Sequence, residues 1–265
     1  MRDGPGVSLA GVALVLGMWT YALLILLPLR LLAKRSPPLA AGGLGARYSP
    51  QPDGPTSIGS AASREADFDD VAPDYDRCVG PFARPIFSAA LDAMAPHLAR
   101  ASRVLDVGCG PGAALRRVAP LVNEGEVVGI DVSFAMLQIA RDRARQARLE
   151  NVALFQVDAA ELPLVFTDSF DLAYSCLVHH HFADPPAAVR GIVASLRSGG
   201  AYAAVDATGP VLTKLATPLT RAVDPGWVGF PRQDGLIAVL ASAGLRHVKW
   251  VQLSPGIGMA IGWRP

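Results

Sequence analysis

The sequence predicts an α/β protein with a doubly wound, mostly parallel sheet that ends in an antiparallel hairpin and follows one N-terminal transmembrane helix. Three observations lead to this fold class. Short runs of β-branched and apolar residues alternate with helical patterns through most of the 265-residue chain. Such alternation is typical of parallel sheets that are covered by helices on both faces. In addition, a turn-rich link joins the last two expected strands, and a long uncharged run begins the chain.

The N-terminal segment has the properties of a membrane anchor. Residues 7–29 contain no charged side chain, and at about 1.5 Å per residue a helix of this length crosses the roughly 30 Å hydrocarbon layer. Arg30, Lys34 and Arg35 follow this run, so the excess of positive charge predicts that the C-terminal domain lies in the cytoplasm. The alternatives are a signal peptide that is cleaved near residues 39–41 and a buried core helix. We expect residues 1–35 to anchor a single-pass membrane protein.

The segment after the anchor is rich in Pro, Gly, Ser and Ala. Residues 36–63 show no hydrophobic periodicity, which predicts a flexible linker before a folded domain over residues 64–265. The chain has 24 Lys and Arg residues against 23 Asp and Glu residues, a balance that lacks the basic character of a nucleic-acid-binding protein. The three cysteines form no CxxC pair, so we expect neither a disulfide framework nor a zinc site.

Strands and helices follow one another in a regular order in the expected domain. The predicted strands cover residues 103–107, 127–131, 152–157, 170–176 and 202–206, and the predicted helices cover residues 81–98, 112–121, 133–148, 185–197 and 233–243. Two more strands are expected at residues 245–253 and 258–263. The Ser-Pro-Gly link between them favours an antiparallel hairpin at the edge of the sheet.

Three alternating glycines follow the first predicted strand. Gly108, Gly110 and Gly112 stand at its carboxyl end, which is where open α/β sheets bind ligands. The spacing Gly108-x-Gly110-x-x-Ala113 also fits a dinucleotide-binding fingerprint. Asp106 precedes the loop and would repel a pyrophosphate, whereas it would favour a ligand that carries an ammonium and a sulfonium group. S-adenosylmethionine has this charge pattern.

The stretch VLDVGCGPG, residues 104–112, resembles the first motif of the class I S-adenosylmethionine-dependent methyltransferases, which have a Rossmann-like sheet. The resemblance continues at the family's spacing over residues 67–265. It is closest to the C-methyltransferases of ubiquinone and menaquinone biosynthesis, because the chain has their N-terminal Ala-Pro-x-Tyr-Asp element and their C-terminal Ala-Gly and Gly-Ile pairs. The resemblance implies a methyltransferase that uses S-adenosylmethionine.

The resemblance also implies a set of cofactor-binding residues. Asp131 would bind the ribose hydroxyls, Val132 and Met136 would cover the adenine faces, and Asp158 and Ala159 would contact the adenine amino edge. By position alone, Asp131 could instead be a solvated strand-end residue, and Val132 and Met136 could be core side chains. Asp158 could equally be a helix N-cap. Tyr75 would close over the bound cofactor, as the tyrosine of the Ala-Pro-x-Tyr-Asp element does in the resembling enzymes. The full implied set is Tyr75, Asp106, Gly108, Cys109, Gly110, Gly112, Asp131, Val132, Met136, Asp158, Ala159 and Cys176.

Three consecutive histidines, His179, His180 and His181, follow the fourth predicted strand. Neighbouring side chains on a strand or helix point in different directions, so one ion cannot readily bind all three and no metal is expected. The resembling methyltransferases often carry a histidine pair at this place, which His180 and His181 match best. Imidazole titrates near neutrality, so one of the two could accept a proton during catalysis. Packing or loop capping is the alternative role.

Together these features predict a membrane-tethered methyltransferase that acts on a small apolar acceptor, quinone-like or lipid-like. Methyl transfer from a sulfonium is an in-line displacement, so alignment and the exclusion of water suffice without a dedicated acid. Few residues separate the fifth predicted strand from Phe230, so the helical acceptor cap of the quinone enzymes is expected to be short. The alternatives are a small-molecule thiol or O-methyltransferase, a Rossmann-type NAD-binding oxidoreductase and a catalytically silent scaffold.

Overall fold

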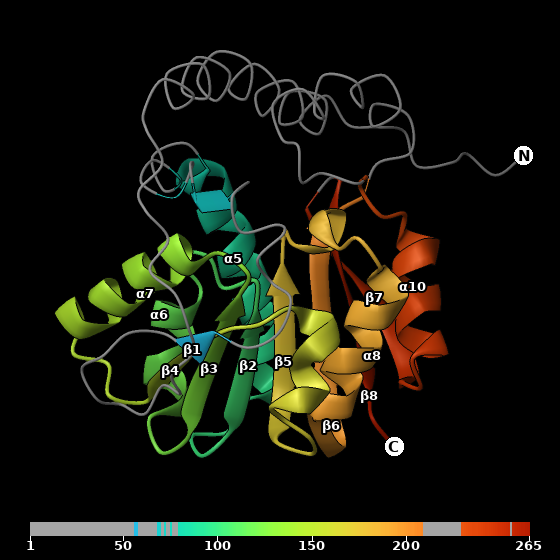
Figure 1. Ribbon diagram of the computed structural model, residues 1–265. Helices are drawn as coiled ribbons and strands as arrows, with labels where there is room; N and C mark the ends of the chain where they lie inside the picture. Colours follow the sequence, from blue (N-terminus) through green and yellow to red (C-terminus); the bar gives the residue numbers. More distant parts are fainter. Residues whose placement is uncertain are drawn as a thin grey trace, which may run out of the picture.

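The computed structural model describes residues 56–57, 68–69, 72, 75, 79–208, 229–254 and 256–265. These residues form an eight-stranded sheet with the strand order β1-β4-β3-β2-β5-β6-β8-β7. Helices cover both faces of the sheet, and the carboxyl ends of its parallel strands lie at the top of Figure 1. Because β2 pairs with β3 on one side and with β5 on the other, the chain reverses its winding direction at β2. Open α/β sheets bind ligands at such a point.

Most bounds of the elements agree with the predicted ones to within a few residues, but β6 begins six residues before the predicted strand 202–206, within the predicted helix 185–197. The strands are β1 (Thr56–Ser57), β2 (Arg103–Val107), β3 (Glu126–Asp131), β4 (Val152–Gln156), β5 (Phe170–Cys176), β6 (Leu196–Ala207), β7 (Arg246–Ser254) and β8 (Ile257–Trp263). The α-helices are α5 (Gly80–Met94), α6 (Leu115–Val118), α7 (Phe134–Gln146), α8 (Pro185–Ser195) and α10 (Gln233–Ser242). Short 3-10 turns are η3 (Ala95–His97), η4 (Ala119–Val122), η5 (Ala159–Leu164) and η6 (His179–His181).

The predicted mostly parallel sheet and its C-terminal antiparallel hairpin are confirmed. Strands β1 to β6 pair in parallel, whereas β8 pairs antiparallel with both β6 and β7. One predicted helix is much shorter than expected, since the segment 112–121 is a turn followed by α6 and η4. Gly112 has φ +78°, which is incompatible with a right-handed helix, and Pro120 lies in the 3-10 turn that follows α6.

The segment predicted as a linker contributes one strand to the sheet. Thr56 and Ser57 form β1, which pairs in parallel with Phe155 and Gln156 of β4 at the sheet edge. The prediction that residues 36–63 contain no folded element is therefore wrong at these two residues, because sheet pairing supplies a partner that local composition does not reveal.

The predicted membrane anchor at residues 7–29 lies outside the described residues. Among the helices that the structure describes, none combines the length and the apolar character that crossing a bilayer requires.

The two sheet faces bury separate apolar clusters, because successive strand residues point to opposite sides. On one face, α5, α6 and α7 pack over a cluster that includes Val104, Leu137 and Tyr174. On the other face, α8, α10 and η5 pack over a cluster that includes Leu105 and Tyr202. This alternation decides which strand residues can reach the ligand-binding edge of the sheet.

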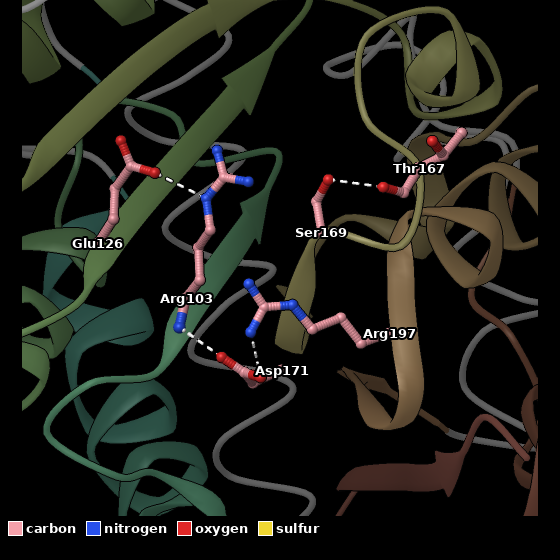
Figure 2. Close-up of polar contacts among 6 residues, drawn as sticks. All are labelled: Arg103, Glu126, Thr167, Ser169, Asp171 and Arg197. Carbon is pink, nitrogen blue, oxygen red and sulfur yellow. Dashed lines mark hydrogen bonds and ion pairs between the residues drawn. The ribbon is translucent and has the colours of Figure 1, made fainter.

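Charged side chains tie together the amino ends of the central strands (Figure 2). The Arg103 guanidinium on β2 donates to Glu126 of β3 at 2.7 Å, and the Arg103 backbone N–H donates to the Asp171 carboxylate of β5 at 2.7 Å. Arg197 of β6 donates to the other oxygen of Asp171 at 3.0 Å. These partly exposed pairs contribute at most about 1 kcal/mol each. They lie at the end of the sheet opposite to the glycine loop.

Candidate functional site

A cavity lies at the carboxyl ends of β2, β3 and β4, where the winding reverses. The cavity wall brings together many of the residues that the sequence implies. Predicted site residues that line it are Tyr75, Gly108, Gly110, Asp131, Val132, Met136, Asp158, Ala159 and His181. Their roles toward a ligand stay predictions, but their placement around one cavity agrees with a common ligand.

The glycine loop adopts a backbone conformation that side chains other than glycine rarely tolerate. Gly108 has φ +65° and Gly110 has φ +50°. A Cβ on Gly108 would lie 2.7 Å from a Val178 methyl group, whereas a Cβ on Gly110 would meet no described atom within 4 Å. The Cys109 backbone N–H donates to the Ile130 carbonyl at 2.9 Å, which holds the loop against β3. The loop therefore leaves an open cradle at Gly110.

Asp131 at the end of β3 organises this loop. One carboxylate oxygen accepts the Gly110 N–H at 2.8 Å, and the other accepts the Ser133 N–H at 2.9 Å. Burial raises the pKa of Asp131 to about 6, although these backbone hydrogen bonds oppose the shift. A carboxylate offers about four acceptor positions, so the Asp131 carboxylate keeps acceptor capacity for a hydroxyl group of a ligand such as a ribose.

Asp106 lies behind the cavity rather than on its wall. It shares a sheet face with Val104, whereas the cavity-lining Val107 points to the opposite face. The side chain is 2% exposed, and Oδ2 has no hydrogen-bond partner among the described residues. Burial raises the pKa of Asp106 to about 7; the nearby Tyr174 hydroxyl opposes this rise, and the Asp131 charge adds to it. A buried carboxyl group of this kind ionises more readily beside a cationic ligand group, so it favours such a group.

Four more predicted site residues also lie away from the cavity wall, namely Cys109, Gly112, Cys176 and His180. Cys109 packs in the apolar cluster beside Leu115, with its Sγ close to Gly129. Gly112 approaches α7, where a Cβ would lie 3.1 Å from that of Ala140. Cys176 shares the α5 face with Asp106, and burial raises the pKa of its thiol well above the ordinary value. Asp106, Cys109, Gly112, Cys176 and His180 therefore do not line the cavity, and their roles toward a cofactor or an acceptor stay predictions.

Asp158, which we expect to contact the adenine, has a structural role as well. The Asp158 carboxylate accepts the Ala160 N–H at 2.9 Å and so caps η5, while Asp158 and Ala159 both line the cavity. The N-cap alternative is thus correct and compatible with ligand binding. Gly191 of α8 lies so close to η5 that a Cβ there would clash with the Ala159 carbonyl. Helix α8 therefore sets the position of this wall.

The N-terminal part of the domain contributes residues that the sequence reasoning missed. Phe68 lines the cavity and makes an edge contact with His181, with the ring centroids 5.0 Å apart. Asp69 accepts hydrogen bonds from the Ser133 hydroxyl and from the Ala135 N–H, the latter at 3.3 Å. Ser133 is the N-cap of α7. These contacts join the segment before α5 to the same wall. The sequence signal that could have identified Phe68 and Asp69 is their position just before the Ala-Pro-x-Tyr element.

The three histidines of η6 take three different directions. His179 Nε2 lies 2.7 Å from the Tyr202 hydroxyl, and burial lowers the pKa of His179 to about 4. His180 Nδ1 lies 2.8 Å from the Asp206 carboxylate. His181 lines the cavity. Among the described residues no cluster of His, Cys, Asp and Glu is arranged to hold a metal ion.

Asp206 is a third residue that the sequence reasoning missed as a site residue. It is fully buried near the carboxyl end of β6, and its position at the end of a predicted strand was the only signal. Burial alone would raise the pKa of Asp206, but the charge of His180 and the hydrogen bond from its ring hold the pKa below the ordinary value. Asp206 is therefore ionised beside His180.

The residues present fit S-adenosylmethionine. The cradle is open at Gly110, the Asp131 carboxylate beside it keeps acceptor capacity, and Asp106 offers a second, buried carboxyl group near the loop. Acids near the loop disfavour a pyrophosphate. Met136 and Ala159 add apolar lining to the cavity, which suits a flat heterocycle.

Known proteins agree with this arrangement. Residues 104–200 match the family described as "Methyltransferase domain". The uncharacterized methyltransferase YcgJ of Bacillus subtilis is 35% identical over 129 residues, which are 48% of this chain and 50% of the relative. The YcgJ crystal structure is 28% identical with a TM-score of 0.57, over 62% of this chain and 70% of that chain. The 2-phytyl-1,4-naphtoquinone methyltransferase of Synechococcus elongatus is 29% identical over 177 residues, covering 58% of this chain and 76% of the relative.

The matching region contains the parts that build the cavity. It runs from β2 into β6 and includes the glycine loop, Asp131, Asp158 and η6. The chain spans about half the length of several curated relatives that it matches, namely 50%, 53% and 47%. Residues 104–200 therefore carry a methyltransferase domain of the class I S-adenosylmethionine-dependent type, and the chain shares the sequence pattern of the ubiquinone and menaquinone C-methyltransferases.

Proposed function

We propose that the protein is a membrane-tethered methyltransferase that transfers the methyl group of S-adenosylmethionine to a small apolar acceptor, quinone-like or lipid-like. The observation that carries the proposal is the pairing of a glycine cradle with Asp106 and Asp131 at the winding reversal. Two carboxyl groups at this place suit a ligand with cationic groups and a ribose, and they oppose a pyrophosphate. This separates the proposed cofactor from NAD, which the glycine spacing alone does not.

The residues of the chain orient the cofactor and exclude water in this proposal. S-adenosylmethionine supplies an electrophilic methyl group on a sulfonium. Phe68, Val178 and Phe182 give the cavity wall beside His181 an apolar character, which suits an apolar acceptor and keeps water from competing with it. Alignment of the two reactants supplies much of the rate in an in-line displacement.

The acceptor and the membrane tether are parts of the proposal that rest on the sequence. The relative from Synechococcus elongatus is named for a phytyl naphtoquinone, an apolar molecule with a ring that bears oxygen. The uncharged run at residues 7–29 would hold the domain beside acceptors that dissolve in the bilayer. A tether raises the local concentration of the site near such acceptors without changing the site itself.

Calorimetry of the full chain in detergent tests the cofactor. We expect S-adenosylmethionine and S-adenosylhomocysteine to bind with dissociation constants in the micromolar range, on the order of −8 kcal/mol, and NAD not to bind. Tight NAD binding with no heat from S-adenosylmethionine would favour the oxidoreductase alternative and overturn the proposal.

A further inference from the structure

A buried histidine and carboxylate, His180 and Asp206, lie beside the cavity without lining its wall. Asp206 uses both carboxylate oxygens on His180: one lies 2.8 Å from the ring Nδ1, and the other accepts the His180 backbone N–H at 3.2 Å. Asp206 is fully buried, and the His180 side chain is 11% exposed. The contact joins β6 to η6 across 26 residues of chain. A buried carboxylate is costly unless it is paired in this way.

The geometry decides which nitrogen of His180 can accept a proton. An ionised carboxylate can only accept hydrogen bonds, so Nδ1 must carry the hydrogen that points to Asp206. The neutral ring then has its lone pair on Nε2, and a proton that arrives there produces a cation paired with Asp206. The same contact fixes the direction of the ring. Asp206 thus prepares His180 as a base.

The neighbouring residues hold this pair firmly and bring it next to the cavity. His179 bonds to Tyr202 of β6, whose hydroxyl also lies 2.8 Å from Ser175 of β5, so the residue that precedes His180 is tied to both strands. The His180 ring centroid is 4.2 Å from that of His181, which lines the cavity, and 5.2 Å from that of Phe230. The base therefore lies beside the wall that would face the acceptor.

We propose that Asp206 is a positioning residue that holds His180 as the proton acceptor for an acceptor molecule with a phenolic or enolic hydroxyl group. The inference rests on the proposed function and specifies its substrate class. An amine or a thiolate can take a methyl group without help from a base, whereas a hydroxyl group must lose its proton. A buried and oriented base is therefore useful for the hydroxyl class in particular.

The proposed step balances in atoms and charge. The bond between the methyl carbon and the sulfonium sulfur breaks, and its electron pair stays on sulfur to give a neutral thioether. The acceptor gives its hydroxyl proton to His180 Nε2 and forms a new bond to the methyl carbon, through oxygen or through a ring carbon conjugated with it. The positive charge that leaves sulfur ends on the imidazolium of His180, next to the Asp206 carboxylate.

Nitrogen NMR of the full chain labelled at histidine tests the positioning without requiring activity. We expect His180 to show the tautomer with hydrogen on Nδ1 and lone pair on Nε2, in both the free and the S-adenosylhomocysteine-bound protein. Asp206→Asn should remove this preference, and His180→Gln should remove the signal and so assign it. A wild-type His180 with hydrogen on Nε2 would overturn the inference while leaving the proposed cofactor untouched.

Methyl transfer to matched soluble probes tests the substrate class. We expect the wild-type chain to methylate 1,4-naphthalenediol and 2-naphthol, and 2-naphthalenethiol as well, since the thiol is largely ionised at pH 8. Asp206→Asn and His180→Gln should lower kcat for the naphthols at least about 10-fold, within the range for a general base. They should change kcat for the thiol less than about 2-fold and leave KM and cofactor binding unchanged.

The matched control is Asp171→Asn, the same substitution in a carboxylate that bonds Arg103 and Arg197 at the opposite end of the sheet (Figure 2). It should lower neither rate. Product analysis separates O-methylation from ring methylation, and either product supports the inference because both release the hydroxyl proton. Equal losses on the naphthols and the thiol, or methylation of the thiol alone, would overturn it. Failure of the wild-type chain to bind S-adenosylmethionine would overturn the proposed function instead.

Discussion

At the scale of single residues, the side chains that we expect to bind or to serve the ligand also make contacts that hold the fold. Asp131 bonds Gly110 and Ser133, Asp158 caps η5 while lining the cavity, and Asp206 holds His180. Such double use means that a substitution changes the shape of the loop as well as a contact to the ligand. Stability and binding therefore have to be measured together for each variant.

Replacing Asp131 by Ala should weaken S-adenosylmethionine binding by about 1.5 to 3 kcal/mol, the range for charge-assisted hydrogen bonds. The variant loses the acceptors expected for the ribose and also the bond that holds the Gly110 N–H. Calorimetry measures the dissociation constant, and circular dichroism confirms that the variant is folded. Asp131→Asn keeps one carbonyl oxygen and should lose less. Unchanged affinity in folded Asp131→Ala would return this carboxylate to a purely structural role.

The buried carboxyl group of Asp106 should make the cofactor-free protein less stable as the pH rises. Its pKa is about 7 in the folded protein against the ordinary 3.8, so between these values the folded state binds more protons than the unfolded state. Stability then falls with rising pH. From pH 5 to pH 8 the loss should be on the order of 2 to 4 kcal/mol. Asp131, whose pKa is raised to about 6, adds a smaller loss of the same sign.

Urea unfolding of the full chain in detergent, without cofactor, measures this dependence. Asp106→Asn cannot ionise, so its free energy of unfolding should be flatter between pH 5 and pH 8 and should exceed that of the wild type at pH 8. An Asp106→Asn variant with the same pH slope as the wild type would show that another group causes the dependence.

At the scale of elements, the cavity is assembled where caps and turns meet at the carboxyl ends of the strands. Ser133 caps the N-terminus of α7, because its hydroxyl oxygen accepts the Met136 N–H at 3.1 Å. The same hydroxyl donates to Asp69. The N-terminus of α8 is capped by Asp184, which accepts the Ala187 N–H at 2.9 Å. The first cap joins the segment that carries Phe68 to the cavity, whereas the second caps its own helix.

Ser133→Ala should therefore affect both stability and cofactor binding. Loss of the N-cap costs about 0.5 to 2 kcal/mol of folding free energy. Loss of the Asp69 contact should also release Phe68 from the wall and weaken S-adenosylmethionine binding several-fold. Asp184→Ala is the matched control, and we expect a similar fall in the urea midpoint with unchanged affinity. If the two variants bind the cofactor equally well, the contact between Ser133 and Asp69 does not shape the site.

At the scale of the whole molecule, the predicted linker between the proposed anchor and the domain already contains a strand of the sheet, which its composition does not suggest. Thr56 and Ser57 extend the sheet beyond β4, and β4 lies directly before the cavity residues Asp158 and Ala159. A shortened protein that keeps the site intact should therefore begin before Thr56, for example at Gln51, rather than after the whole predicted linker.

Such a shortened protein should bind S-adenosylmethionine as tightly as the full chain and methylate soluble naphthols at the same rate. Its rate on a long-chain alkyl hydroquinone in phosphatidylcholine vesicles should fall at least about 10-fold, because it lacks the local concentration that a tether provides. Vesicle assays with both proteins at equal concentration measure this ratio. Equal rates on the vesicle-borne hydroquinone would remove the main support for a bilayer-dissolved acceptor.

The sequence by itself determined the order and type of the elements. The predicted bounds of β2 and β5 coincide with those of the structure, because apolar runs and the residues that end them are local signals. The glycine loop was equally readable, since left-handed backbone at Gly108 and Gly110 demands glycine whatever surrounds it. The match of residues 104–200 to the methyltransferase domain family agrees with that local pattern.

Only the tertiary structure decided which side chains meet. Asp106 and Cys176 follow the same motifs as the cavity residues, but strand alternation turns them to the opposite face of the sheet. The contact of Asp206 with His180 spans 26 residues, and that of Asp69 with Ser133 spans 64. Such pairs depend on strand order, register and helix packing, which arise from interactions between distant segments. Local periodicity does not depend on those interactions and so cannot predict them. The pairing of His180 with Asp206 and the placement of Phe68 in the cavity wall are therefore seen only in the folded chain.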